Sequence, residues 1–344
     1  MRPENLQQKS PATILFTHYG DEWIRGSERC LLDLVTHIDR DRFSPVVWCN
    51  SEAMVDEAGK LGVPVYRSEF PLLCGWKRPR FAFRAYAALI RQGIRLVDSH
   101  GVDLVHANSG APNQWLNLVA RARRLPLLTH LHSRNQLRDR LSLGLHQVSM
   151  AVGVSQPVID QLLDDGMPIR RTRVVPNGID TRRLDQQETI NLRDLLDIEN
   201  NEFLIATTGS LIHRKGTDLI IDAVFRLVGE GFPIQLAIIG DGPERTHLQR
   251  QIQRLDLQDH VHLLGERPNV AGLLRGGVNL FVSAAREEVF GLALAEAGLA
   301  GLAVVAPAVG GIPGVVVDGQ TGRLFPPQDN DALTQAIRML YLKP

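Results

Sequence analysis

Short apolar runs alternate with longer amphipathic stretches along this chain, and no other feature restricts its fold as much. The run Ala12–His18 is followed by Ser27–Ile38, whose apolar residues recur at helical spacing. Similar runs follow at Pro45–Asn50, Val63–Tyr66, Asp103–Ala107, Leu127–His132, Met150–Ser155 and Arg173–Pro176, with helical patterns between most of them. Strands separated by helices form βαβ units, which build a mostly parallel sheet. The first half of the chain therefore predicts an α/β domain.

A second series of the same kind begins at Phe203. It predicts strands at Gln235–Ile239, Val261–Leu263, Leu280–Ser283 and Ala303–Ala306, and helices at Thr217–Val228, Glu244–Leu255, Phe290–Leu299 and Asn330–Leu340. A turn signal at 175–178 and polar residues at 181–189 separate the two series. One hydrophobic core serves at most about 250–300 residues, so we predict two domains, 1–185 and 186–344. Open parallel sheets bind ligands beyond the carboxyl ends of their strands, so two such sheets facing each other predict an interdomain cleft.

Charge and cysteine content narrow the functional classes. The formal net charge of the 344 residues is +0, which argues against a generally basic nucleic-acid-binding protein, so we expect no nucleic-acid partner. Three cysteines without C-x-x-C spacing argue against a disulfide framework and against a cysteine zinc site. They favour a reducing, cytoplasmic location.

Two stretches bear on membrane contact. The first 185 residues carry 25 Lys/Arg against 19 Asp/Glu, and the basic excess is densest in Trp76–Val97, which has no acidic residue and several aromatic ones. This segment fits either a basic amphipathic surface that docks on anionic lipid at the inner face of the membrane, or an ordinary surface helix with an aromatic inner side. The stretch 291–317 carries a single charge, but its glycines and prolines interrupt any continuous helix, so we expect no membrane span there.

A glycine-rich turn with two cations follows the first strand of the second domain. It reads Gly209-Ser210-Leu211-Ile212-His213-Arg214-Lys215-Gly216 and stands directly before a helix. Glycine turns, basic side chains and helix N-termini favour phosphate groups. The segment predicts a diphosphate site, although Arg214 and Lys215 are also compatible with plain surface charges.

Two glutamates eight positions apart carry the sharpest signal. Glu288 is expected in the loop at the end of a strand, and Glu296 about two turns into the following helix. Carboxylates suit sugar hydroxyl groups, because they accept two or more hydrogen bonds from a diol. The helix around Glu296 is otherwise almost wholly apolar, and a charge on a buried helix needs a partner. Gly291 allows close backbone approach at the helix N-terminus, where free N–H groups favour phosphate.

A Gly-Gly turn follows the next strand. Gly310 and Gly311 stand at its centre, in Val309-Gly310-Gly311-Ile312-Pro313-Gly314. Such a turn can present backbone N–H groups to an anion, or it can serve as a tight turn and nothing more. Both interpretations stay open on the sequence alone.

Together these residues resemble the retaining, GT-B-fold, nucleotide-sugar glycosyltransferases known as glycosyltransferase family 4. The matching pieces run from about Ile14 to Leu340, and they are Ser27-Glu28, Val174-Val175-Pro176-Asn177-Gly178-Ile179-Asp180, Gly209…Lys215-Gly216, Ile239-Gly240-Asp241-Gly242-Pro243-Glu244, Glu288-x7-Glu296, Gly310-Gly311-Ile312-Pro313 and Asp318-Gly319-Gln320-Thr321-Gly322. The resemblance implies two Rossmann-like domains. It also implies transfer of a sugar from a nucleotide-diphosphate sugar to a glycan or lipid-linked glycan acceptor.

The resemblance also implies roles for individual residues. Lys215, with Arg214, is expected to bind the donor diphosphate, Glu288 the transferred sugar and Glu296 the nucleotide ribose. His132 matches a histidine that ends a strand of the first domain and approaches the donor sugar. Backbone contacts near the phosphates and the sugar are expected from Phe290, Gly291 and Leu292, and donor contacts from Gly26, Ser210, Gly310 and Gly311.

The family needs neither a metal nor another cofactor, because cations and helix N-termini stabilise the departing nucleotide diphosphate. His130 and His132 point to the same strand face and could be metal ligands, but no third ligand is evident.

Alternatives remain on the sequence alone. The chain has Arg25, Ser210 and Gly314 where the family usually has other residues, and family members generally continue beyond the position of Pro344. These departures favour a truncated or non-catalytic GT-B-like binding protein. A dinucleotide-dependent oxidoreductase lacks its G-x-G-x-x-G after the first strand. The D-x-D of a metal-dependent transferase is matched only by Asp39-Arg40-Asp41 and Asp329-Asn330-Asp331, which are typical of turns and caps.

Overall fold

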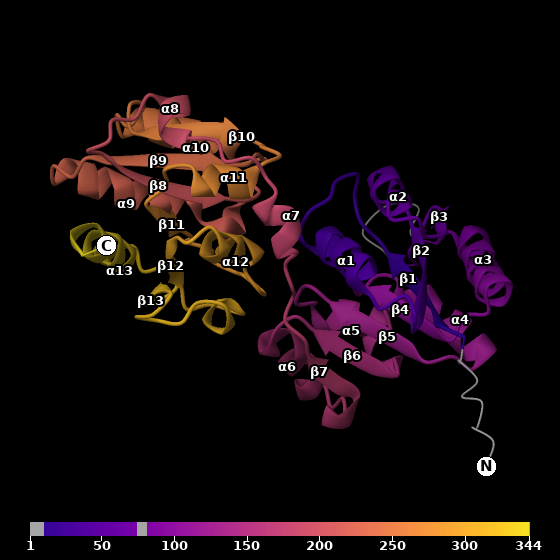
Figure 1. Cartoon of the computed structure of the whole chain (residues 1–344). Helices are drawn as coiled ribbons and strands as arrows, with labels where there is room; N and C mark the ends of the chain where they lie inside the picture. The colour runs from indigo at the N-terminus through magenta and orange to yellow at the C-terminus, as the bar shows by residue number, and fades with distance from the viewer. Residues whose placement is uncertain (1–9, 74–80, 344) are drawn as a thin grey trace, which may run out of the picture. The chain divides into compact units, whose positions relative to one another are not determined.

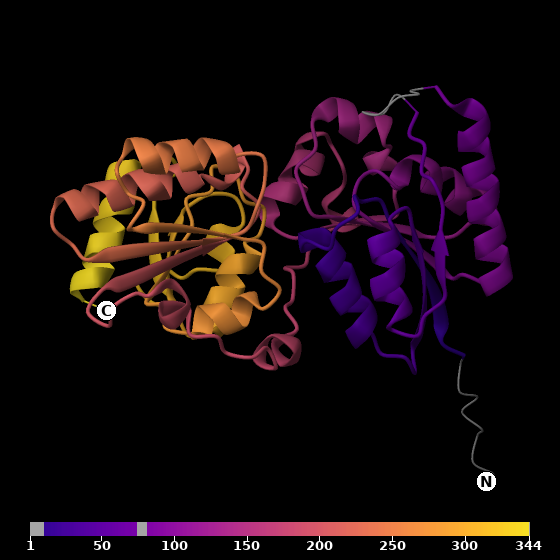
Figure 2. The same cartoon turned by 90° about the horizontal axis from the view of Figure 1, so that it is seen from above.

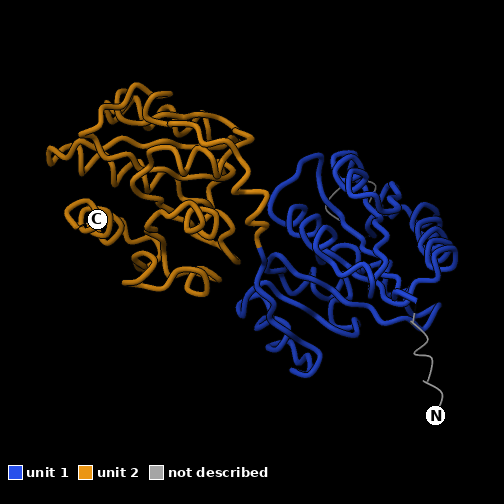
Figure 3. The backbone as a smooth tube through the Cα atoms, in the orientation of Figure 1, with its two compact units in different colours: residues 1–178 blue, residues 179–344 orange. Residues whose placement is uncertain are grey.

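The structure is a computed structural model that describes residues 10–73 and 81–343. The chain divides into two compact units, residues 1–178 and 179–344, each with its own sheet (Figures 1 and 3). The division falls a few residues before the boundary predicted after Asp185, inside the segment between the two series of strands. In both units helices cover the two faces of the sheet (Figure 2).

The first unit contains a seven-stranded parallel sheet with the order β3-β2-β1-β4-β5-β6-β7. Its strands are β1 Ala12–His18, β2 Phe43–Cys49, β3 Val65–Arg67, β4 Leu104–Asn108, β5 Leu127–Leu131, β6 Met150–Gly153 and β7 Thr172–Val174. Its helices are α1 Gly26–His37, α2 Glu52–Gly59, α3 Phe83–His100, α4 Asn113–Arg123, α5 Leu137–Ser142 and α6 Gln156–Asp164, with 3-10 turns η1 Leu145–Gln147 and η2 Ile169–Arg171. The helices fit their sequence, because apolar residues such as Leu31, Leu32 and Val35 of α1 fall on one side and are buried against the sheet.

The second unit contains a six-stranded parallel sheet with the order β10-β9-β8-β11-β12-β13. Its strands are β8 Phe203–Thr208, β9 Ile234–Ile239, β10 Val261–Gly265, β11 Leu280–Val282, β12 Ala303–Pro307 and β13 Gly322–Phe325. Its helices are α7 Thr181–Asp185, α8 Leu192–Leu196, α9 Thr217–Gly229, α10 Arg245–Arg254, α11 Val270–Arg275, α12 Leu292–Leu299 and α13 Asn330–Leu342, with 3-10 turns η3 His213–Lys215 and η4 Ile312–Gly314. Alternate residues of the central strands enter the two cores on opposite faces, as Ile205 and Ala206 of β8 do.

The alternation of strands and helices is confirmed in both units, but the short helices α7, α8 and α11 were not predicted and other elements differ in their bounds. Strand β13 was not predicted, because its four residues include an arginine and its only strand partner is β12 at the sheet edge. Helix α12 begins at Leu292, two residues later than predicted. Gly291 has φ +102°, a left-handed conformation that cannot belong to the helix.

Helix α3 contains most of the segment Trp76–Val97 and shows which of its side chains are buried. Its aromatic and aliphatic side faces the core, where Tyr86 and Leu89 are buried. A Cβ on Gly93 would lie 2.8 Å from a methyl carbon of Val119, so α3 packs tightly against α4. Arg84, Arg91 and Arg95 are exposed. Two exposed aromatic rings remain at the helix start, Phe81 and Phe83, with centroids 6.2 Å apart. Residues 76–80 lie outside the described part. None of the described helices combines the length and the apolar character that a membrane span requires.

Candidate functional site

A pocket lies at the carboxyl ends of β8 and β11, the two central strands of the second unit. The strand order reverses between them, and open parallel sheets bind ligands at such a reversal. Predicted residues lining the pocket include Gly209, Ser210, Lys215, Glu288 and Gly291, and Thr207, Thr208, Leu211, Thr217 and Ser283 join them.

An ion pair between Lys215 and Glu288 forms the charged part of this pocket. The Lys215 Nζ lies 2.6 Å from Glu288 Oε2, and the two side chains are only 25% and 13% exposed. The other oxygen, Oε1, accepts hydrogen bonds from the backbone N–H groups of Val289 at 3.1 Å and Phe290 at 3.5 Å. Burial alone raises the pKa of Glu288, but the charge and hydrogen bond of Lys215, the charge of Arg214 and the Phe290 N–H together lower it. The carboxylate is therefore ionised, and the pocket presents one cation beside one anion.

Glycines let the loops around this pair approach each other closely. Gly216 has φ +65°, and a Cβ there would lie 1.9 Å from the carbonyl oxygen of Ala284. A Cβ on Gly310 would lie 1.7 Å from the carbonyl oxygen of Glu288. That same oxygen accepts a hydrogen bond from the N–H of Gly311 at 3.1 Å. The Gly-Gly turn therefore supports the backbone of Glu288, and the N–H of Gly311 is not turned toward an anion.

Arg286 links the two loops, a role that its position as one charge in a loop did not indicate. Its guanidinium contacts both carboxylate oxygens of Asp218, at 2.8 and 2.6 Å. It also donates to the carbonyl of His213 at 2.8 Å. The backbone N–H of Arg286 donates to the carbonyl of Arg214 at 2.8 Å. Asp218 lies at the start of α9, so this residue holds the turn carrying Lys215 against the loop carrying Glu288.

Other predicted donor residues of this unit lie beside the pocket lining. Arg214 is exposed, with one long contact of 3.4 Å to the carbonyl of Glu287. Phe290 is buried, and Leu292 is the first residue of α12. Glu296 is half-buried, as are most residues of α12, and Leu294 and Ala297 are fully buried. The expected role of Glu296 at the nucleotide ribose stays a prediction.

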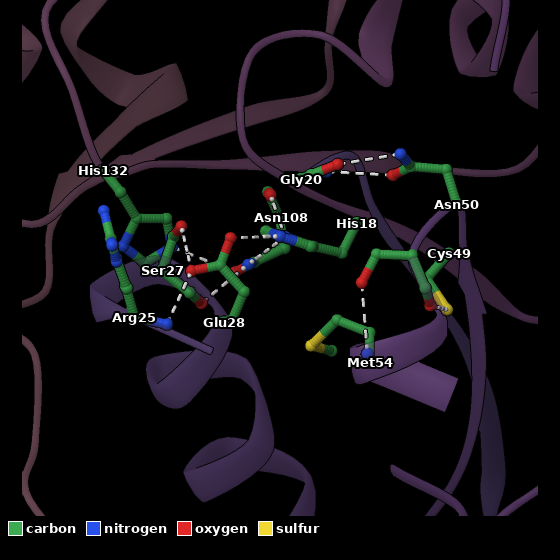
Figure 4. Close-up of polar contacts among 11 residues, drawn as sticks. His18, Gly20, Arg25, Ser27, Glu28, Cys49, Asn50, Met54, Asn108 and His132 are labelled. Carbon is green, nitrogen blue, oxygen red and sulfur yellow. Dashed lines mark hydrogen bonds and ion pairs between the residues drawn. The ribbon is translucent and has the colours of Figure 1, made fainter. Parts of the chain in front are cut away.

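The first unit has polar side chains at the matching place, the ends of its central strands β1 and β4 (Figure 4). His132 Nε2 lies 2.9 Å from Asn108 Oδ1, and Asn108 Nδ2 lies 2.9 Å from His18 Nδ1. His18 Nε2 lies 2.9 Å from the carboxylate of Glu28 on α1. Of these four residues, only His132 was predicted as a site residue. Gly26, also predicted, is the exposed first residue of α1.

Burial dominates the electrostatics of this region. It lowers the pKa of His106 to about 3 and that of His130 to about 4, and it holds the pKa of His132 well below its usual value. The ring centroids of His130 and His132 are 4.2 Å apart. Among the described residues, no group of three or more His, Cys, Asp or Glu side chains is arranged to hold a metal ion.

Both units match known families of sequences. Residues 189–344 match the family described as "Glycosyl transferases group 1", and residues 24–183 match "Glycosyltransferase Family 4". The N-acetyl-alpha-D-glucosaminyl L-malate synthase of Bacillus anthracis is 26% identical over 74% of this chain and 69% of its own length. The GDP-mannose-dependent alpha-(1-6)-phosphatidylinositol monomannoside mannosyltransferase of Mycolicibacterium smegmatis is 27% identical over 86% of this chain and 80% of its own.

Solved structures share the fold across both units. The crystal structure of Anabaena HepE in complex with UDP-glucose has a TM-score of 0.78 at 24% identity, and it covers 96% of this chain and 89% of its own. A glycosyltransferase from Rickettsia africae has a TM-score of 0.82 at 19% identity, with 97% and 89% covered. The two family matches and this shared architecture show that the chain belongs to the glycosyltransferases of the GT-B fold.

Proposed function

We propose that the protein is a retaining glycosyltransferase that moves a sugar from a nucleotide-diphosphate sugar to a glycan or lipid-linked glycan. One observation carries the proposal: the Lys215–Glu288 ion pair faces a pocket at the strand-order reversal of the second unit. A diphosphate there neutralises Lys215, and the ionised carboxylate of Glu288 accepts hydrogen bonds from sugar hydroxyls. The names of the two relatives, a glucosaminyl malate synthase and a GDP-mannose-dependent mannosyltransferase, support this substrate class.

In the proposed reaction, the bond between the sugar's anomeric carbon and the diphosphate oxygen breaks, and the acceptor's hydroxyl oxygen bonds to that carbon on the same face. The acceptor's proton leaves with the departing diphosphate. Lys215 and the N-terminus of α12 stabilise the negative charge that develops, and Glu288 holds the sugar. This scheme uses no metal, no other cofactor and no protein nucleophile. Transfer that persists unchanged after exhaustive chelation supports it, and transfer that stops and returns only with a divalent ion contradicts it.

Calorimetric titration with UDP, GDP, ADP and their common sugars tests the donor site. We expect one nucleotide to bind in the micromolar range, and Glu296→Ala to weaken it by about 1–3 kcal/mol through loss of a charged hydrogen bond to the ribose. Glu230→Ala is the matched control, because Glu230 pairs with Arg338 at the far end of α9. If none of these ligands binds, the donor site is absent; binding without transfer to any acceptor favours the non-catalytic alternative.

We also propose that the first unit meets an anionic lipid surface on the cytoplasmic side of a membrane. Exposed Phe81 and Phe83 lie next to exposed Arg84, with Arg91 and Arg95 further along α3. Aromatic rings beside cations suit the headgroup region of a bilayer. Co-sedimentation at low salt should show binding to phosphatidylserine vesicles and loss of it in the double variant Phe81→Ser/Phe83→Ser. Ile169→Ser, at an exposed residue of η2, is the control. Equal retention by neutral and anionic vesicles contradicts the proposal.

A further inference from the structure

The four polar side chains at the strand ends of the first unit form one continuous chain of hydrogen bonds. It runs from His132 through Asn108 and His18 to Glu28 (Figure 4). These residues come from the end of β5, the ends of β4 and β1, and the first turn of α1. Asn108, His18 and Glu28 are all buried. Of the four, the family resemblance gives a role only to His132, which is expected near the donor sugar, so the other three need an explanation of their own.

The orientation of the Asn108 amide is fixed by a backbone group. Asn108 Nδ2 lies 3.1 Å from the carbonyl oxygen of Ser27. A carbonyl oxygen only accepts hydrogen bonds, so the NH₂ side of the amide must face it. The opposite atom, Oδ1, is then the one that faces His132 at 2.9 Å. A flipped amide would bring two acceptors together at Ser27.

This orientation settles which nitrogen of His132 carries its proton. Asn108 Oδ1 only accepts, so His132 Nε2 must donate. Burial keeps the imidazole neutral, and a neutral ring has one N–H. Nδ1 therefore carries a lone pair. In the described part of the chain this buried Nδ1 has no hydrogen-bond partner.

The far end of the chain holds Asn108 in place. Burial raises the pKa of Glu28, but the hydrogen bond from His18 and those from backbone N–H groups outweigh it and the net shift is downward, so Glu28 accepts as a carboxylate. Its oxygen Oε2 also accepts from the backbone N–H of Arg25 and the hydroxyl of Ser27, both at 3.2 Å. A Cβ on Gly20 would lie 2.6 Å from His18 Nε2, so the loop backbone packs directly over the His18–Glu28 pair.

We propose that Asn108 is a positioning residue, which fixes the ring of His132 and keeps its proton on Nε2, so that His132 offers only a hydrogen-bond acceptor, Nδ1. The meaning of this tautomer for sugar recognition rests on the proposed function. A neutral acceptor fits a hydroxyl group of the transferred sugar, and it does not fit a phosphate oxygen, which also only accepts. His132 then contributes to recognition of the sugar and not of the diphosphate.

Nitrogen-15 NMR of the histidine rings in the full chain tests the tautomer directly. In the wild type, we expect Nε2 of His132 to show the shift of a protonated nitrogen and Nδ1 that of a bare one. In Asn108→Leu, which has a similar volume and no polar atoms, this preference should be lost. Asn117→Leu is the matched control, because Asn117 is also buried and donates to two carbonyls, those of Asn113 and Gly144. It should leave the His132 signals unchanged.

A wild-type His132 protonated on Nδ1 would overturn the proposal, as would an unchanged tautomer in Asn108→Leu. If Asn108→Leu does not fold, the wild-type spectrum still tests the tautomer of His132.

Kinetics give the second readout. Asn108→Leu should lower kcat/KM for transfer about tenfold, as loss of one hydrogen bond predicts, while affinity for the nucleotide diphosphate stays within twofold. Equal loss of nucleotide affinity contradicts a role limited to the sugar. If wild type binds no nucleotide, the proposed function fails, but the tautomer result stands by itself.

Discussion

The two units of this chain share a strand order at their centre and use it differently. In each, the order reverses between the first strand and the fourth, β1 and β4 in one unit and β8 and β11 in the other. At the reversal in the second unit, the Lys215–Glu288 pair lines an open pocket. At the reversal in the first unit, the His18–Glu28 pair is buried, with side-chain exposures of 1% and 6%.

The difference lies in which groups cover the sheet where its strand order reverses. In the second unit, the loops after β8 and β11 leave a pocket that the Lys215–Glu288 pair lines. In the first, the backbone of Gly20 is anchored by two hydrogen bonds to the side chain of Asn50 and packs over the pair. The same topology therefore leaves a lined pocket in one unit and a buried polar network in the other.

The largest expected effect of this difference is on acid stability. His106 and His130 have pKa values of about 3 and about 4 in the fold, below the usual 6.5. Their contribution to stability is complete above pH 6.5 and is lost as pH falls through 6.5 toward those values. In that window each of the two histidines lowers the free energy of unfolding by about 1.4 kcal/mol per pH unit. The first unit should therefore lose several kcal/mol of stability between pH 6.5 and 4.5.

Hydrogen exchange with mass spectrometry follows both units at once, and tryptophan fluorescence reports the first unit alone, since all four tryptophans precede residue 179. Among the described histidines of the second unit, only His262 has a lowered pKa, and the carboxylates Asp218 and Glu288, whose pKa values are also lowered, titrate at lower pH. In His106→Leu, the stability of the first unit should depend less steeply on pH. If both units lose hydrogen-exchange protection together above pH 5, the expected difference in their acid stability is contradicted.

The next largest effect is expected on turnover. Lys215→Ala should lower the rate of transfer about 10²–10³-fold, because a fixed cation near the departing diphosphate is lost and Glu288 is left buried without its partner. The second unit should still fold. Lys60→Ala, which removes an exposed lysine paired with Glu57 in the first unit, is the control and should leave the rate unchanged. A rate within twofold of wild type for Lys215→Ala would remove the pocket from the reaction.

A smaller effect is expected from filling the space over the buried pair. A methyl group on Gly20 would collide with His18 Nε2 and Glu28 Oε1, so Gly20→Ala should lower the free energy of unfolding of the first unit by about 1–3 kcal/mol. In Gly59→Ala the new Cβ meets nothing within 4 Å, and stability should stay the same or rise by about 0.4–1 kcal/mol. Urea titration followed by tryptophan fluorescence separates the two. Equal stability of both variants would show that the loop over the pair is loose.

The smallest effect is expected from the link between the two pocket loops. Arg286→Gln removes the two-oxygen contact with Asp218 and should weaken nucleotide binding about fivefold, or about 1 kcal/mol, because the loops are less well held. Arg226→Gln breaks a more exposed pair with Asp331 and should change affinity by a negligible amount. Isothermal calorimetry measures both. An identical affinity for the Arg286 variant means that the loops are held by their backbone contacts alone.

Much of the fold could be predicted because its signals are local. A short apolar run and a helical apolar pattern placed β1 and α9 within a residue or two. The glycine turn before Lys215 and the Glu288 loop were predicted at strand ends, where a parallel sheet exposes them. Strand β13 was missed because its pairing with β12, and not its own four residues, makes it a strand. Arg286 was missed because an arginine in a loop has no pattern that distinguishes an ion-pair clamp from a solvated charge.

By itself, the sequence determined two parallel α/β units, the strand ends where ligands are expected, and Lys215 and Glu288 as separate site candidates. Only the tertiary structure decided which polar residues are exposed to a ligand and which are sealed in the core. Glu28 and Glu288 both follow a strand of a parallel sheet in sequence, yet Glu28 is covered by the Gly20 backbone and Glu288 faces a pocket. The physical reason is that burial and hydrogen-bond partners come from contacts between segments far apart in the chain, which no local pattern encodes.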